Sequence, residues 1–202
     1  MKELLKSLIV LPFLCVALSS LSGCGGTSAP NTATAPSNNA GNGSTAAKSA
    51  YPPVPAGVAN VELESVDGKM SKVADHKGKL LVLNLWGIWC GPCREEMPHL
   101  AQMQKQYGDK GLEVISLNIG DQSLNPEPME NIKKYIEQSK LDYPIARITR
   151  DSVAQFYAVS QAQAVPQTFL VDRDMHMRGV WVGGGQSIMN QVQQAIEKTI
   201  NE

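Results

Sequence analysis

The stretch WGIWCGPCREEMP, residues 86–98, places two cysteines two residues apart with Gly-Pro between them. Such a pair can coordinate a metal ion, form a structural disulfide or exchange electrons with another disulfide. An apolar run precedes the motif and a segment with helical spacing follows it, so the pair lies where a buried strand passes into a helix. The function depends on which of the three chemistries this junction supports.

Strands and helices alternate on both sides of the motif. Residues 80–85 and 112–119 are apolar runs expected as buried strands, and Met97, Leu100 and Met103 recur at helical spacing between them. This order predicts an α/β fold with a central mixed sheet, helices on both faces and an N-terminal β-hairpin extension. The other expected elements are hairpin strands at 61–63 and 69–73, a helix around 129–136, a short strand at 143–148, a helix at 151–159, strands at 167–171 and 177–182, and a final helix at 187–200.

A metal site at the cysteine pair lacks the other ligands it would need. A structural zinc ion takes four ligands, whereas the three histidines of the chain, at positions 76, 99 and 176, are widely separated. Haem attachment requires a histidine directly after the second cysteine, and Arg94 occupies that position. We therefore expect neither a metal ion nor a cofactor at this site.

The start of a helix at the motif favours redox chemistry. Pro92 is tolerated there because amide groups in the first turn have no partner within the helix. Cys90 then lies at the positive end of the helix dipole, where a thiolate is stabilised. Cys93 follows one turn later on the same face and is expected to be more buried. The two residues therefore have the arrangement of an attacking and a resolving cysteine.

Residues 89–93, WCGPC, match the active-site sequence of thioredoxins, and the longer string LVLNLWGIWCGPCREEMPHL resembles the extracytoplasmic, membrane-tethered thioredoxin-like reductases of the TlpA and ResA type. A second motif, AVPQTFLVDRD at residues 164–174, resembles the strand of that family that begins with a cis-proline facing the active site. The resemblance covers residues 58–200 and implies a thioredoxin-like fold with a cis Val165–Pro166 peptide bond beside the cysteines. The substrate-binding residues that it implies are Trp89, Gly91, Pro92, Val165 and Pro166.

Three positions near the motifs need separate interpretation. Thioredoxins carry a buried aspartate six residues before the first cysteine, but this chain has Asn84, which cannot accept a proton. The TlpA and ResA relatives carry a glutamate three residues after the second cysteine, and Glu96 occupies that position. Helical spacing also places Glu96, unlike Glu95, on the face of Cys93, where it could move protons to and from the thiol; the alternative is an ordinary first-turn acid. Gln167 replaces the usual Thr or Ser after the cis-proline and is expected to alter the substrate groove.

The N-terminus predicts export and a lipid anchor. Residues 1–23 combine a positively charged start with an apolar run of the length found in secretory signal peptides. The sequence LSGC at residues 21–24 resembles the lipobox of bacterial lipoproteins, which implies that Cys24 carries the lipid. Only the two cysteines of the motif then remain as thiols, so no disulfide framework is available to include them.

The composition changes sharply after the lipobox. Residues 25–50 contain no Leu, Ile, Val or aromatic residue, so nothing in them can be buried to offset the entropy of ordering. We expect residues 24–50 to form the lipidated cysteine with a flexible linker, and residues 51–202 to form one domain. The formal net charge of −1 does not favour a nucleic-acid partner.

These features predict a thiol–disulfide oxidoreductase outside the cytoplasm, on the periplasmic side if the host has two membranes. Cys90 would attack a disulfide, and Cys93, assisted by Glu96, would release the reduced product. The resemblance implies that exported proteins such as apocytochrome c are the substrates and that a membrane thiol donor recharges the pair. We expect the protein to be a monomer.

Two alternative functions stay open at this point. The same pair could act as a disulfide oxidant or isomerase, depending on its redox potential. The protein could also be a copper-handling lipoprotein, because Met175, His176 and Met177 contain soft ligands that suit Cu(I), and the cysteines could join them. The other interpretation of Met175, His176 and Met177 is a polar hairpin tip flanked by strand residues.

Overall fold

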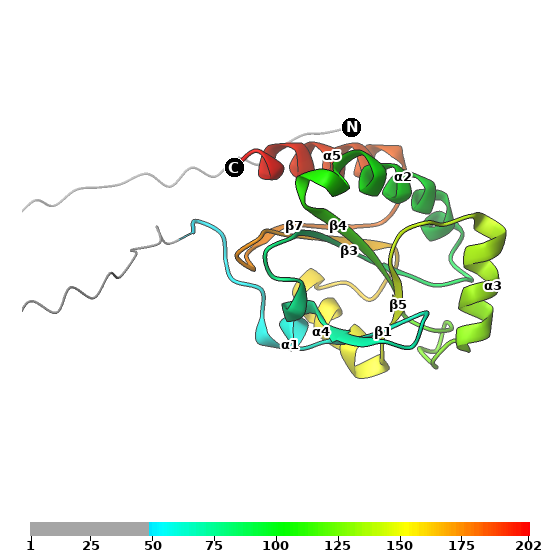
Figure 1. Ribbon diagram of the computed structural model, residues 1–202. Coiled ribbons are helices and arrows are strands. Elements are labelled where there is room, and N and C mark those ends of the chain that lie inside the picture. Colours follow the sequence, from blue (N-terminus) through cyan, green and yellow to red (C-terminus); the bar gives the residue numbers. More distant parts are fainter. Residues whose placement is uncertain (1–48) are drawn as a thin grey trace, which may run out of the picture. The chain divides into compact units, whose positions relative to one another are not determined.

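The apolar run before the cysteine motif forms a central strand of a seven-stranded sheet (Figure 1). The computed structural model describes residues 49–202. The predicted signal peptide of residues 1–23, the lipidation site Cys24 and nearly all of the linker of residues 24–50 lie outside the described residues. Within the described part, no helix is both long enough and apolar enough to cross a membrane.

One mixed sheet runs through the domain. Its strands are β1 (Glu62–Ser65), β2 (Met70–Lys72), β3 (Leu80–Trp86), β4 (Leu112–Asn118), β5 (Ile145–Arg147), β6 (Gln167–Val171) and β7 (Met177–Val182). They are arranged in the order β2-β1-β5-β4-β3-β6-β7. The three strands β3, β4 and β5 are parallel, and an antiparallel hairpin extends the sheet on each side. The predicted mixed sheet with an N-terminal hairpin is therefore confirmed.

Helices cover both faces of this sheet, as Figure 1 shows. The helices are α1 (Ala56–Ala59), α2 (Gly91–Tyr107), α3 (Met129–Ser139), α4 (Arg150–Ser160) and α5 (Gln186–Ile200), with short 3-10 turns η1 (Val73–His76) and η2 (Gly108–Lys110). The helices α2, α3 and α5 pack against one face, and α1 and α4 pack against the other. The cysteine motif thus opens a helix that packs against a sheet whose central strand is covered on both faces.

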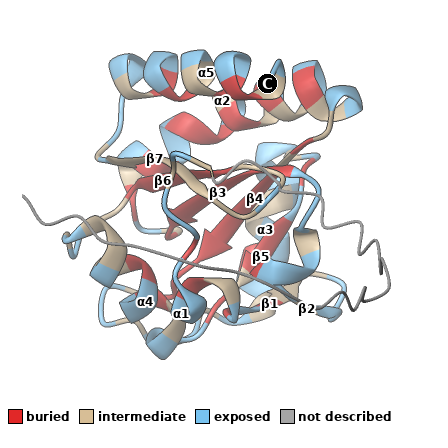
Figure 2. Cartoon of the chain, turned by 90° about the vertical axis from the view of Figure 1, so that its left-hand side faces the viewer, coloured by how far each residue is buried: buried red, intermediate tan, exposed pale blue. Residues whose placement is uncertain are grey.

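The strand β3 is buried at every position, because helices lie above and below it (Figure 2). Side chains alternate between the two faces of a strand. Val82 and Trp86 accordingly join the core beneath α2, whereas Leu83 joins the core beneath α4. Asn84 is two residues from both Val82 and Trp86, so its side chain points to the same face of the sheet. Its amide therefore lies on the α2 side, beneath the cysteine motif.

Candidate redox site

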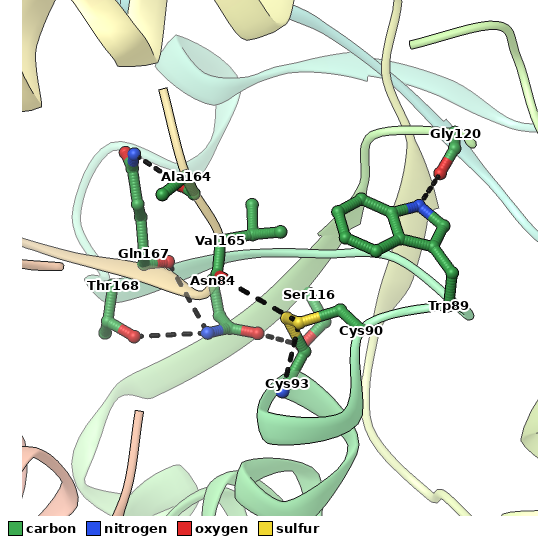
Figure 3. Close-up of a disulfide and its surroundings, with 10 residues drawn as sticks. All are labelled: Asn84, Trp89, Cys90, Cys93, Ser116, Gly120, Ala164, Val165, Gln167 and Thr168. Atoms are coloured by element: carbon green, nitrogen blue, oxygen red, sulfur yellow. Dashed lines mark hydrogen bonds between the residues drawn. A yellow bond between two sulfur atoms is a disulfide. The ribbon is translucent and has the colours of Figure 1, made fainter. Parts of the chain in front are cut away.

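The cysteine pair forms a disulfide at the N-terminus of α2 (Figure 3). The S–S distance is 1.99 Å and the Cα atoms are 5.3 Å apart. Cys90 is 4% exposed and Cys93 is completely buried. Partner disulfides can therefore reach the pair only from the side of Cys90.

The helix start provides the electrostatic environment for Cys90. This residue is the N-cap of α2, and its Sγ accepts a hydrogen bond of 3.2 Å from the backbone N–H of Cys93. In the reduced protein, the same N–H group and the positive end of the helix dipole stabilise a thiolate at this position. Pro92 lies in the first turn, where a missing N–H costs no intrahelical hydrogen bond.

The strand β6 brings the second motif to the disulfide. The Val165–Pro166 peptide bond is cis, as the family resemblance implied. The Val165 carbonyl oxygen lies 3.8 Å from the Cys90 Sγ, which is a contact rather than a hydrogen bond in the oxidised pair, because a disulfide sulfur carries no proton. Figure 3 shows this carbonyl directed at the disulfide. Residues about 75 positions apart in the chain therefore meet at one sulfur atom.

Gln167 was expected to alter the substrate groove, but its amide does not line the surface beside the disulfide. Its side chain is fully buried, and its Nε2 donates hydrogen bonds to the carbonyl oxygens of Ala164 at 2.7 Å and Ala162 at 3.0 Å. The next residue, Thr168, faces Asn84 on the α2 side, so the alternation along β6 turns Gln167 to the opposite face. The amide holds the backbone that leads into the cis-proline and has no direct access to a substrate.

Glu96 lies one turn after Cys93, also on the buried side of α2, and is 1% exposed. Burial raises the pKa of its carboxyl group to about 7, while the nearby N–H of Gly185 and the amide of Asn84 oppose this rise. Neither carboxyl oxygen makes a hydrogen bond of good geometry within residues 49–202. The neighbouring Glu95 is exposed. A buried carboxyl group with a pKa near neutrality thus lies one turn beyond Cys93 on α2.

Gly184, in the turn between β7 and α5, packs directly against this carboxyl group. A Cβ atom added at Gly184 would lie 2.9 Å from the Glu96 Oε1, 3.2 Å from the Pro166 Cγ and 3.2 Å from the Pro92 Cβ. These three groups therefore surround one point beside the disulfide. Gly184 thus contacts Glu96, the cis-proline Pro166 and Pro92 of the cysteine motif at the same time.

We predict that Gly184→Ala destabilises the protein, because the added methyl group must push the carboxyl group or one of the prolines away. The expected loss in the free energy of unfolding is about 1–3 kcal/mol, measured by chemical denaturation of the oxidised protein. Gly91→Ala is the matched control, since a Cβ added there meets open space in the first turn of a helix. Equal stability of the two variants would show that the contact around Gly184 is loose.

The surface around the buried pair is formed by the motif itself. Trp89 is 40% exposed, and its indole Nε1 donates a hydrogen bond of 2.9 Å to the Gly120 carbonyl oxygen (Figure 3). Pro92 is exposed and Gly91 is partly exposed, whereas Pro166 is buried beneath them. The residues expected to bind substrate are therefore adjacent, although Pro166 offers little surface.

Several residues at the site were not identified from the sequence. Gly120 anchors Trp89, Gly184 adjoins Glu96, and Thr168 and Ser116 contact the buried amide of Asn84. Only the Gly-Gly-Gly run at residues 183–185, placed before the final helix, offered a signal in the sequence. The other contacts join segments that are far apart in the chain, so their spacing carries no pattern.

The soft ligands near β7 already have structural contacts. Met175 and Met177 pack against the core beneath α1 and α4. His176 has its Nδ1 atom 3.4 Å from the Asp172 Oδ1. These contacts support the interpretation of Met175, His176 and Met177 as part of a hairpin.

A cysteine pair oxidised at the start of a helix, facing the strand that follows a cis-proline, defines a thioredoxin-like redox domain. The model of the AhpC/TSA family matches residues 55–180, and the chain belongs to this family. Among curated relatives, the thiol-disulfide oxidoreductase ResA of Geobacillus thermodenitrificans is 32% identical over 121 residues, which are 60% of this chain and 64% of that protein. The ResA of Bacillus subtilis is 31% identical over 113 residues, 56% of this chain and 58% of the relative. The chain thus spans less than two thirds of these relatives.

Solved structures share the fold. A thiol:disulfide interchange protein of the thioredoxin family from Chlorobium tepidum has a TM-score of 0.61 and 24% identity, covering 76% of this chain and 99% of that one. A secreted thiol-disulfide isomerase from Corynebacterium glutamicum has a TM-score of 0.60 and 21% identity, covering 71% and 84%. The thioredoxin-like fold expected from the two motifs is therefore confirmed.

Proposed function

We propose that the protein is a thiol–disulfide oxidoreductase that reduces disulfides of other proteins through Cys90 and Cys93. The observation that carries this proposal is the disulfide between these residues at the N-terminus of α2, with the Val165 carbonyl oxygen 3.8 Å from the Cys90 Sγ. The names of the relatives, thiol-disulfide oxidoreductase and thiol:disulfide interchange protein, are consistent with it.

The reaction proceeds in two displacements. The reduced Cys90 thiolate attacks a partner disulfide, forming a mixed disulfide and releasing one partner thiolate. Cys93 then loses its proton to Glu96 and attacks the Cys90 Sγ, which forms the internal disulfide and releases the second partner thiolate. Two electrons pass from the pair to the partner, and the two partner thiolates take up protons from solvent and from Glu96.

Partner binding is assigned to the surface around the pair. Trp89, Gly91 and Pro92 present the motif at this surface, and Val165 with Pro166 places a backbone carbonyl next to Cys90. An extended segment of the partner can pair with the backbone at Val165, which would bring its disulfide onto Cys90.

The cellular setting is part of the proposal. The signal-like residues 1–23 and the lipobox cysteine Cys24 support an extracytoplasmic protein anchored to a bacterial membrane, with residues 25–50 as its tether. A membrane thiol donor would recharge the pair, and the targets would be oxidised exported proteins, by analogy apocytochrome c. The domain would act as a monomer.

The redox potential decides the direction of electron flow. We expect a potential near −270 mV, as for thioredoxin, which has the same Gly-Pro dipeptide between its cysteines. Equilibration with glutathione gives this value, and insulin reduction tests the activity, with Cys90→Ala/Cys93→Ala as the inactive control. A potential well above about −200 mV would contradict the assignment as a reductant and favour the oxidant or isomerase function.

A further inference from the structure

The orientation of Trp89 depends on a loop that is distant from the cysteine motif in the sequence. This β4–α3 loop comprises residues 119–128, between the end of β4 and the start of α3. The Trp89 indole Nε1 donates a hydrogen bond of 2.9 Å to the Gly120 carbonyl oxygen of the loop (Figure 3). Trp89 is 40% exposed and directly precedes Cys90. The loop therefore holds an indole that belongs to the proposed partner-binding surface.

The direction of the Gly120 carbonyl group is set inside this loop. It shares one planar peptide unit with the Asp121 N–H, so the two groups turn together. The Asp121 N–H donates a hydrogen bond of 2.9 Å to the Asn125 carbonyl oxygen. The Gly120 N–H, which donates to the Asn118 Oδ1 at 2.9 Å, belongs to the preceding peptide unit and leaves the carbonyl group free to rotate. The acceptor of the Trp89 hydrogen bond thus depends on where the loop places Asn125.

The segment between Asn125 and α3 is stiff. Pro126 and Pro128 lie on either side of Glu127. A proline ring holds φ at about −65°, and the residue before a proline is restricted to extended conformations. The Asn125 N–H also donates a hydrogen bond of 2.9 Å to the Asp121 Oδ1, which closes the loop on itself. The position of the Asn125 carbonyl group is therefore coupled to that of the Glu127 carbonyl group.

Arg147, at the end of β5, holds the Glu127 carbonyl group. Its Nη1 donates a hydrogen bond of 2.9 Å to this oxygen, while its Nε and Nη2 donate to the Glu64 Oε2 at 3.0 Å and 2.6 Å. Glu64 lies directly opposite Arg147 on the antiparallel strand β1, so the two side chains share one face of the sheet. Both are partly buried, at 34% and 25% exposure. The carboxylate thus fixes the guanidinium group with its third nitrogen toward the loop.

We propose that Arg147 is a positioning residue for partner binding: through Glu127 and the β4–α3 loop, it sets the direction of the Gly120 carbonyl group and so orients the Trp89 indole. Glu64 acts with it by fixing the guanidinium group. The inference rests on the proposed function, in which Trp89 contacts the partner. The hydrogen bonds of Arg147 within residues 49–202 go to Glu64 and Glu127, so the chemistry of the cysteine pair should not depend on it.

Two disulfide substrates of different size test the inference. In single turnovers of the reduced Arg147→Gln variant with insulin, the half-saturating insulin concentration is expected to rise about three- to tenfold, while the limiting rate is unchanged. Ellman's reagent is too small to require the Trp89 surface. The first thionitrobenzoate released reports the attack by Cys90, and the second reports the displacement by Cys93. Both releases should keep the wild-type rates in this variant.

Arg178→Gln is the matched control for the loss of a paired arginine. Arg178 contacts the carboxylates of Asp172 and Glu202, and Asp172 follows the end of β6 that is remote from the cis-proline. The insulin kinetics of this variant should equal those of the wild-type protein. A second variant, Arg147→Lys, keeps a charged donor at position 147 and should lie between the wild-type protein and Arg147→Gln.

The indole N–H resonance of Trp89 in nitrogen-15 NMR of the oxidised protein gives a readout that does not depend on activity. In Arg147→Gln this resonance should shift, and its proton should exchange with solvent faster, because the hydrogen bond to Gly120 is weakened. Trp89→Phe removes the indole N–H altogether. In that background, Arg147→Gln should cause no further rise in the half-saturating insulin concentration, because both changes act on one interaction.

Two results would overturn the inference and leave the proposed function intact. One is an unchanged Trp89 resonance in folded Arg147→Gln and Arg147→Lys, and the other is an additive effect of Arg147→Gln and Trp89→Phe on insulin binding. If the wild-type protein did not reduce insulin, the proposed function would fail instead. The NMR spectra would then still decide whether Arg147 orients Trp89.

Discussion

A Cys93→Ser variant is expected to retain its partner proteins through a mixed disulfide at Cys90. Within residues 49–202, the buried Cys93 is the only cysteine besides Cys90. A serine at position 93 therefore leaves the mixed disulfide without an internal group that can resolve it. The lifetime of this species should increase on the order of 10³-fold or more. Expression in the native envelope, acid quenching with thiol alkylation, and mass spectrometry of the complexes would identify the partners.

Two controls make the trapping experiment specific. Cys90→Ser removes the attacking sulfur, so it should capture no partner protein. The complexes of Cys93→Ser should dissociate when a reducing agent is added. If Cys90→Ser captured partner proteins in equal amounts, Cys90 would not be the attacking residue. A complete absence of complexes with both variants would remove support for exported proteins as substrates.

Replacing Glu96 with glutamine should slow the second displacement by about a hundredfold, because the amide cannot accept the proton of Cys93. In the wild-type protein, the rate of this step should rise with pH through the pKa of Glu96, about 7, as the carboxylate becomes available. The variant should lose this dependence. The two-step release of thionitrobenzoate measures both quantities, with the exposed neighbour in Glu95→Gln as the control. A normal second step in Glu96→Gln would mean that Cys93 transfers its proton elsewhere.

The same carboxyl group should also affect stability. Its pKa rises from 4.5 in the unfolded chain to about 7 in the folded protein, so the folded state binds the proton more tightly. The stabilising contribution is complete below pH 4.5 and is lost as the pH rises through 7, a difference of about 3 kcal/mol. Glu96→Gln should remove this part of the pH dependence, and denaturation at pH 5 and pH 8 would show it.

The sequence predicted the elements that have a strong local pattern. The strands at 167–171 and 177–182 were placed at their observed bounds, and the helix start after Cys90 was correct. Helical spacing also separated the buried Glu96 from the exposed Glu95. The two strands were located because they flank the polar turn at residues 172–175, and the two glutamates were separated because residues three apart share one face of a helix.

Other features depend on contacts that no local pattern contains. The short α1 and η1 elements were not predicted, because four residues are too few to show a period. The effect of Gln167 on the groove was not predicted correctly, because the direction of its side chain is set by its position on β6, where it hydrogen-bonds the backbone of Ala162 and Ala164. The contacts of the Ser116 hydroxyl group with Asn84 and with Tyr143 join segments that become neighbours only in the folded topology.

The turn of three glycines beside the disulfide constrains how the protein can evolve. Gly183 and Gly185 have φ angles of 93° and 104°, which other residues rarely adopt, and the position between them has no space for a methyl group. Substitutions at all three positions should therefore destabilise the protein. At Gly183 and Gly185 the cause is the backbone angle, and at Gly184 it is the lack of space. Adaptation to new partners should proceed instead through the exposed residues Trp89 and Pro92. Their side chains can be exchanged without changing the buried residues beneath the disulfide.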